Sequence, residues 1–248
     1  MSGPVQPGLT ADTLLRAYAL GIFPMAESRD NLQIHWIEPR QRGVFPIGGF
    51  HVSRSLARTL AKGQFQITTD RDFRGVLQGC ADRPETWINP TIEGLYLDLY
   101  RKGHAHSLEV WNGARLIGGI YGVTLGAAFF GESMFSRETD ASKIALAFLM
   151  QRLQAGGFTL FDTQFNTPHL ASLGAVEIPR AEYLRRLKKA VEAKARFNPP
   201  GFRPDYSLAG LARGRSLVET APSSAAESAP SSTGPAPSGK RQRKGQTS

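Results

Sequence analysis

Cysteine is almost absent from this sequence, with only Cys80 among 248 residues. One thiol cannot form an internal disulfide, and zinc sites built on cysteine need several. No apolar run approaches the roughly 18 residues of a membrane span, and residues 1–10 lack the charged and apolar regions of a signal peptide. These absences exclude disulfide-rich secreted and membrane-spanning classes, and we expect a protein of the reducing cytoplasm.

The composition is otherwise that of a globular protein, with 41% hydrophobic and 21% charged residues. The formal net charge is +9, of which the segment 214–248 supplies only +3. A basic body favours a polyanionic partner, with nucleic acid first among them.

Three regions are expected from changes in composition. Residues 1–63 form a small N-terminal domain, and residues 64–213 form a larger domain. Residues 219–239 contain six Ser, five Ala and four Pro without apolar periodicity. We therefore predict that 214–248 is a disordered tail.

The order of helical and strand patterns predicts an α+β domain with a mixed sheet flanked by helices. Thr10, Ser53 and Asn89 have the character of helix N-caps, and Asp70 and Asp140 are assigned the same role. Strands are expected at 65–69, 104–111, 115–123, 127–135 and 158–162, with a tight turn at 112–113. Residues 35–46 are expected to be mainly loop. A final basic helix is expected at 180–196.

An apolar run interrupted by a glycine and a carboxylate lies within residues 127–143. Gly131 and Glu132 are followed directly by Ser133, Met134 and Phe135. Glycine weakens strand packing and an unpaired buried carboxylate is costly, so a strand with only a core role has little use for this pair. The pattern suits a cleft in which a ligand passes over Gly131. A glutamate on an edge strand that reaches solvent would also fit.

A second polar pair, Asp162 and Gln164, lies where a short apolar strand ends, a place at which α/β folds commonly put ligand groups. Asp162 could instead be a structural cap. His104 and His106 share a strand face, but no third metal ligand is placed nearby, so we expect no metal site. Arg54, Arg58 and Lys62 fall at i, i+4 and i+8 and form one basic stripe, which suits phosphate binding or a solvated face equally.

A series of sequence blocks resembles the bacterial leucyl/phenylalanyl-tRNA–protein transferases over about residues 10–195. The blocks, in order, are GIFPM (21–25), SRS (53–55), CA with TWI (80–81, 86–88), GHAHSLEVW (103–111), GGIYGV (118–123), FFGESMFSR (129–137), ASKIAL (141–146), DTQ (162–164) and HLASLGAVEIPR (169–180).

The resemblance implies an acetyltransferase-like main domain and a reaction that uses no cofactor. A leucine or phenylalanine, with methionine as a further possible donor residue, would pass from aminoacyl-tRNA to the N-terminus of a protein that begins with Arg or Lys. The product is then marked for degradation through the N-degron pathway. The partners implied are Leu-tRNA, Phe-tRNA and these acceptor proteins, with no membrane and a monomeric enzyme.

The resemblance also implies roles for particular residues. Asp162 and Gln164 match a pair assigned to activation of the attacking amine, and Glu132 matches a glutamate at the reaction centre. The residues implied around the donor side chain and terminal adenosine are Met25, Trp87, Tyr96, Phe129, Gly131, Ser133 and Met134, and those implied to hold the tRNA acceptor stem are Arg54, Arg58 and Lys62.

Some features depart from the family pattern. Some members carry Trp at the position of Met25 and a Trp pair at 35–36, and their N-terminal part is longer, so the choice between donor residues stays open. Two other functions are weighed. A CoA-dependent N-acyltransferase would need a glycine-rich pyrophosphate loop ahead of the helix at Asp140, which is missing. A non-catalytic RNA-binding module would have no use for Glu132 or Asp162.

Overall fold

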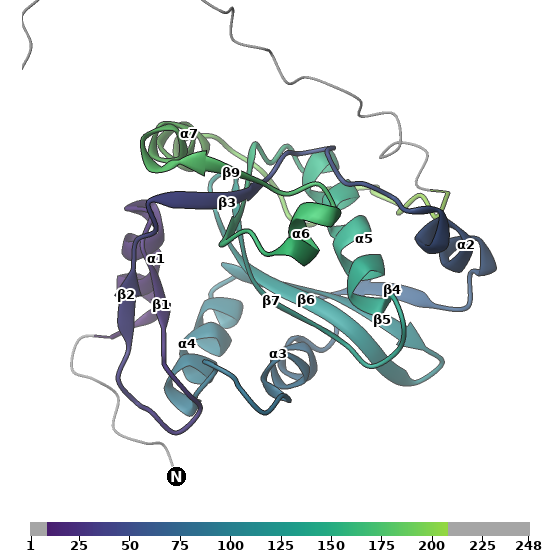
Figure 1. Cartoon of the computed structure of the whole chain (residues 1–248), viewed down its shortest axis with the longest axis horizontal. Coiled ribbons are helices and arrows are strands. Elements are labelled where there is room, and N and C mark those ends of the chain that lie inside the picture. Colours follow the sequence, from purple (N-terminus) through teal and green to yellow (C-terminus); the bar gives the residue numbers. More distant parts are fainter. Residues whose placement is uncertain (1–8, 208–248) are drawn as a thin grey trace, which may run out of the picture. The chain divides into compact units, whose positions relative to one another are not determined.

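The structure is a computed structural model that describes residues 9–207. Its centre is a seven-stranded sheet with the order β4-β5-β6-β7-β8-β3-β9 (Figure 1). Neighbours β7 and β8 run parallel, and the other neighbours run antiparallel. The sheet is therefore mixed, as predicted. Its strands are β3 (Gln41–Phe45), β4 (Gln66–Thr69), β5 (Ala105–Asn112), β6 (Arg115–Leu125), β7 (Ala128–Ser136), β8 (Leu160–Gln164) and β9 (Val176–Pro179).

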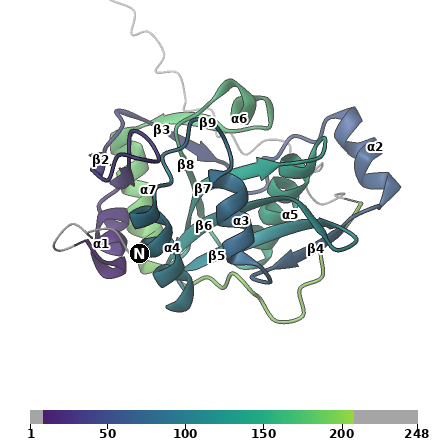
Figure 2. The ribbon, with the colours of Figure 1, turned by 90° about the horizontal axis from the view of Figure 1, so that it is seen from below.

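Helices cover both faces of this sheet. One hydrophobic core lies beneath α1 (Ala11–Ala19), α3 (Phe73–Ala81), α4 (Pro90–Arg101) and α7 (Arg180–Glu192). A second core lies on the other face, beneath α2 (Arg54–Lys62), α5 (Ala141–Ala155) and α6 (Pro168–Ser172). Figure 1 shows α3 and α4 on the opposite side of β5–β7 from α5, and Figure 2 shows α3 in front of these strands. The expected α+β class with flanking helices is confirmed.

Local signals start several helices where they were predicted. The side chains of Thr10, Ser53 and Asn89 each accept a hydrogen bond from a backbone N–H in the first turn. The prediction at Asp70 is wrong, because Asp72 caps α3 by accepting from Gly75, while Asp70 adopts a left-handed φ of 56°. Asp140 also makes no side-chain cap, and its carboxylate instead accepts from Thr59 and Lys143.

The segment 35–46 was expected to be mainly loop, and it contains two strands instead. A short β2 (His35–Ile37) pairs with β1 (Phe23–Met25) in a separate two-stranded sheet. β3 enters the main sheet between β8 and β9. The first 63 residues thus contribute a strand to the main sheet, and the domain boundary at residue 63 stays a prediction. The predicted tail, 214–248, lies outside the described residues.

No helix within residues 9–207 is long and apolar enough to cross a membrane.

Candidate active site

Strands β7 and β8 pair over only three positions before they separate. The last pair joins Phe130 to Asp162. Beyond it, Gln164 pairs only with Gly43 of β3, which lies along the other edge of β8. A cavity of about 290 Å³ opens where the two strands diverge. Its wall is formed by β6, β7 and β8 together with residues from α5, from α6 and its N-cap, and from the loop after α3. The lining residues are Arg83, Trp87, Ile120, Gly131, Glu132, Ser133, Met134, Leu146, Phe161, Thr163, Thr167 and Leu170.

Glu132 is the extra residue of a β-bulge in β7. Tyr121 of β6 pairs with Ser133, and the next residue, Gly122, pairs with Gly131, so Glu132 has no partner across the ladder. The bulge changes which side chains face each core: Phe130 and Phe135 reach the same core although their spacing is odd. A bulge re-aims a side chain, and here it turns a carboxylate toward the cavity.

Three donors hold the Glu132 carboxylate. The hydroxyls of Tyr18 and Tyr96 donate to its two oxygens at 2.6 Å each, and the Gln164 side-chain amide donates at 3.1 Å. The two tyrosine oxygens also lie 2.8 Å apart. The carboxylate therefore has a fixed direction in the wall of the cavity.

Burial dominates the electrostatics of Glu132. Desolvation raises its pKa to about 7, although the hydrogen bonds from Tyr18, Tyr96 and Gln164 oppose this rise. Burial and the nearby Glu132 charge raise the pKa values of both tyrosines well above the usual range, so both stay protonated and act as donors. A carboxyl group with a pKa near 7 can take up and release a proton at neutral pH.

Asp162 lies behind this site and is fully buried. Both carboxylate oxygens are engaged by Arg42, whose Nε and Nη2 donate at 2.9 and 2.7 Å. Tyr183 donates to Oδ2 at 2.7 Å, and the backbone N–H of Gln164 donates to Oδ1 at 2.8 Å. Asp162 is thus bound by four donors and is not among the residues that line the cavity.

Arg42 is itself enclosed. Its guanidinium lies over the rings of Phe23 and Tyr183, at 4.7 and 4.5 Å from their centroids, and Nη1 donates to the carbonyl of Gly21 at 2.9 Å. Burial alone would lower the pKa of Arg42, but hydrogen bonds and charge attraction from Asp162 outweigh it and raise the pKa. The cluster joins the segment that contains α1 and β1 to the end of β8.

Gln164 occupies a strained turn. Its φ is 65°, and the N–H of Phe165 donates to the carbonyl of Thr163 at 2.7 Å across it. This i to i+2 bond with positive φ marks a γ-turn of the rare kind, which costs about 1–3 kcal/mol of strain. Gly43 permits the turn, because a Cβ there would lie 2.5 Å from the Phe165 backbone. Asp162 supports the turn through the Gln164 N–H.

The predicted site residues separate into those that meet at the cavity and those that do not. Trp87, Gly131, Glu132, Ser133 and Met134 line it, and Tyr96 and Gln164 bind Glu132. Met25, in β1, and Phe129 are not among the lining residues. Phe129 packs edge-on against Phe161, and that ring lines the cavity.

Gly131 has a clear steric role. A Cβ at this position would lie 2.8 Å from the Phe161 ring. The missing side chain therefore makes room for an aromatic residue of the cavity wall.

The basic stripe forms as predicted on α2. Arg54, Arg58 and Lys62 are exposed, and none of them forms an ion pair with another residue of the range 9–207. Thr59, between them, bonds to Asp140 at the start of α5.

Three residues of the site were not predicted from the sequence. Tyr18 and Tyr183 match helical core positions, and Arg42 lies in a segment expected to be loop. Arg42 did offer one signal, since it precedes the apolar residues Val44 and Phe45 in a pattern that also fits a buried strand.

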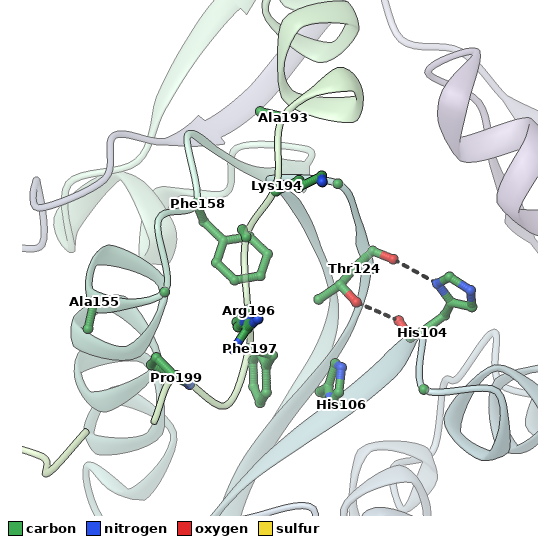
Figure 3. A pocket seen from close by; sticks show the side chains of 14 residues that line it. His104, His106, Thr124, Ala155, Phe158, Ala193, Lys194, Arg196, Phe197 and Pro199 are labelled. Atoms are coloured by element: carbon green, nitrogen blue, oxygen red, sulfur yellow. Dashed lines mark hydrogen bonds between the residues drawn. The ribbon is translucent and has the colours of Figure 1, made fainter. Parts of the chain in front are cut away.

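A larger cavity of about 740 Å³ lies elsewhere, at the C-terminal end of α5 (Figure 3). His104 and His106 line it; His106 is bound to Asp70 at 2.9 Å and stacks on Phe197. Within residues 9–207, no group of three potential ligands could hold a metal ion.

Family models and individual relatives both identify the leucyl/phenylalanyl-tRNA protein transferases. A family model described as leucyl/phenylalanyl-tRNA protein transferase matches residues 44–188, and the model of its N-terminal domain matches residues 8–40. A leucyl/phenylalanyl-tRNA–protein transferase of Cereibacter sphaeroides is 67% identical over 199 residues, covering 80% of this chain and 93% of that protein. One from Ruegeria pomeroyi is 65% identical over 189 residues, covering 76% and 90%. Among solved structures, FemX is similar over 68% of this chain and 66% of its own, with 13% identity and a TM-score of 0.45.

Proposed function

Because this chain belongs to the leucyl/phenylalanyl-tRNA protein transferase family, it is an aminoacyltransferase, and we propose that it moves leucine or phenylalanine from tRNA to proteins that begin with Arg or Lys. The predicted monomeric state stays a prediction. Aminoacyl-tRNA is a cytoplasmic substrate, so we place the reaction there, where the modified proteins would be marked for degradation.

One observation carries the mechanism: Glu132 lies in the cavity wall with a pKa of about 7. The reaction is aminolysis of an ester, in which a C–N bond forms and the C–O bond to the ribose breaks. Its obstacle is protonation, since an α-amino group has a pKa near 8 and is mostly cationic at neutral pH. The ammonium group first releases one proton to water. As the neutral amine attacks, Glu132 accepts a second proton from it and returns that proton to the ribose oxygen that leaves.

In this mechanism Gln164 helps to bind the attacking amine, and Asp162 acts by positioning Gln164. The Gln164 side-chain N–H donates to Glu132, so the Gln164 carbonyl oxygen, Oε1, can accept a hydrogen bond from the incoming amine. Asp162 contacts Arg42, Tyr183 and the Gln164 backbone, so it is a positioning residue and not the base. This differs from the sequence-based interpretation, in which Asp162 and Gln164 together activate the amine.

The cavity also suits the donor residue. Its volume of about 290 Å³ lies at the small end of ligand pockets, and its lining includes Ile120, Met134, Leu146, Phe161 and Leu170. An apolar side chain is therefore favoured, and thioether and aromatic walls can adapt to its shape.

A transfer assay tests the function. Radiolabelled Leu-tRNA, Phe-tRNA or acetyl-CoA is offered with two acceptors that differ only in an N-terminal Arg or Ala. We expect transfer from the charged tRNAs to the Arg acceptor alone. Transfer from acetyl-CoA would instead show a CoA-dependent acyltransferase, and tRNA binding without transfer would show an RNA-binding module.

A further inference from the structure

Arg83 is the cation of the catalytic cavity. It follows α3 by two residues, is exposed, and shares the lining with one other ionisable side chain, Glu132. A hydrogen bond links the two parts of the wall that hold these charges: Arg83 donates to Ser133, the residue that follows Glu132 in β7.

Three hydrogen bonds fix the Arg83 guanidinium. Nε donates to the carbonyl of Cys80 at 2.9 Å, and Nη2 donates to Ser133 Oγ at 3.0 Å and the Met134 carbonyl at 3.2 Å. A guanidinium has five donors, so two, both on Nη1, have no partner within residues 9–207. Arg83 also forms no ion pair there; the adjacent Asp82 lies 3.8 Å from Arg137 instead.

A purely structural role explains only part of this geometry. An arginine after a helix often satisfies one of its last carbonyls, and the bond to Cys80 does so. It does not require Nη2 to reach across to β7, nor does it use Nη1. A rigid, permanently charged fork with two free donors suits the oxygens of a phosphate.

We propose that Arg83 binds the phosphate on the 5′ side of the terminal adenosine of the charged tRNA. This inference rests on the proposed function, which puts the aminoacyl ester beside Glu132. The nucleoside that bears the ester carries this phosphate as its nearest anionic group. Arg83 thereby binds the anionic group, the 5′ phosphate, that a nucleotide donor has and a nucleoside donor lacks.

Two small donors isolate this contact: the phenylalanyl ester of adenosine and the same ester of adenosine 5′-monophosphate. Charge-assisted hydrogen bonds of this kind correspond to about tenfold or more in affinity. We expect the wild-type enzyme to prefer the phosphate-bearing donor by about that factor in kcat/KM. Arg83→Gln should reduce the preference to about one, because kcat/KM should fall more with the phosphate-bearing donor than with the adenosine ester. Arg83→Lys should keep part of it, since the charge remains but the fork is gone.

Arg137→Gln is the matched control, because Arg137 is exposed nearby but does not line the cavity. It should keep the full preference. An undiminished preference in Arg83→Gln would overturn the inference, and so would an equal fall with both donors or a wild-type enzyme without preference. Wild-type transfer from Phe-tRNA tests the function separately: its absence would remove the function and this inference with it.

Discussion

Arg42 and Asp162 form a bidentate ion pair in which both side chains are almost inaccessible to water, at 2% and 0% exposure. Such a pair is weak evidence for stability in itself, but removing one partner leaves a buried charge without compensation. The pair also has a positional effect, because Asp162 holds the strained turn at Gln164.

Removal of the Asp162 charge should therefore destabilise the protein. Asp162→Asn leaves Arg42 buried without a carboxylate, which costs about 3–5 kcal/mol. At 2–4 °C per kcal/mol, thermal unfolding should shift down by roughly 6–20 °C. Replacement of both partners, as Arg42→Met with Asp162→Leu, should restore much of the stability but not the activity, because the Gln164 turn stays unsupported. Full activity in the double variant would show that Asp162 does not position Gln164.

Glu132→Gln should reduce kcat on the order of 10²–10⁴-fold, the usual range for removal of a general base. The amide keeps the size of the side chain. Its oxygen can accept from Tyr96 and Gln164 while its NH2 group donates to the Tyr18 hydroxyl, so thermal unfolding should not shift down. Steady-state kinetics with Leu-tRNA measure the effect, with Glu138→Gln, at an exposed ion pair with Arg115, as the control. A kcat within a few fold of wild type would mean that the amine is activated elsewhere.

Tyr96→Phe should move the pH dependence of transfer. The Tyr96 hydroxyl stabilises the charged form of Glu132 and so lowers its pKa; without it the pKa rises above about 7. The acid limb of kcat/KM should shift to higher pH. Tyr100→Phe is a suitable control, since that hydroxyl bonds to the Asp70 carbonyl. If Tyr96→Phe leaves the acid limb unchanged, the group that titrates there is not Glu132.

Glu132 should also make stability depend on pH. Its pKa is raised from 4.5 to about 7 on folding, so the folded protein holds a proton that the unfolded chain releases. The folded state therefore binds more protons in this window, and its stability falls as pH rises from about 4.5 to 7. Denaturant unfolding of wild type and Glu132→Gln should show a difference that grows across this range and is constant above it. A constant difference throughout would place the carboxylate in a solvated environment.

The basic stripe on α2 should contribute to tRNA binding. Arg54→Ala with Arg58→Ala should raise the KM for charged tRNA and reduce the slope of log K against log salt by nearly one unit for each phosphate that is no longer neutralised. Neither side chain forms an ion pair within the described residues, so folding should be unaffected. Binding measured from 50 to 200 mM salt decides the question, and an unaltered slope would make the stripe a solvated face.

The sequence was informative where structure depends on near neighbours. Caps at Thr10, Ser53 and Asn89 need only the next three residues, and these were placed correctly. The tight turn at Gly113 is equally local. Glu132 was recognisable because a charge beside a glycine is unusual in an apolar strand.

Contacts between segments that lie far apart in the sequence could not be predicted from local patterns. β3 reads as loop because its partners, β8 and β9, lie more than a hundred residues away, and their pairing overrides weak local propensity. Tyr18, Tyr96 and Tyr183 have the spacing of core residues, and only the assembled fold shows that their hydroxyls bind carboxylates. The partner of Asp162 could not be found without β3.

The position of β3 between β8 and β9 has a consequence during synthesis. A ribosome makes β3 early and its two neighbours late, at about 5–20 residues per second, so the strand waits on the order of ten seconds for its place. Pairing over such a separation in sequence is intrinsically slow even after release. During that interval Arg42 has no carboxylate to bind and the Gln164 turn does not exist. A nascent chain thus contains α2 and its basic stripe well before it can transfer an amino acid.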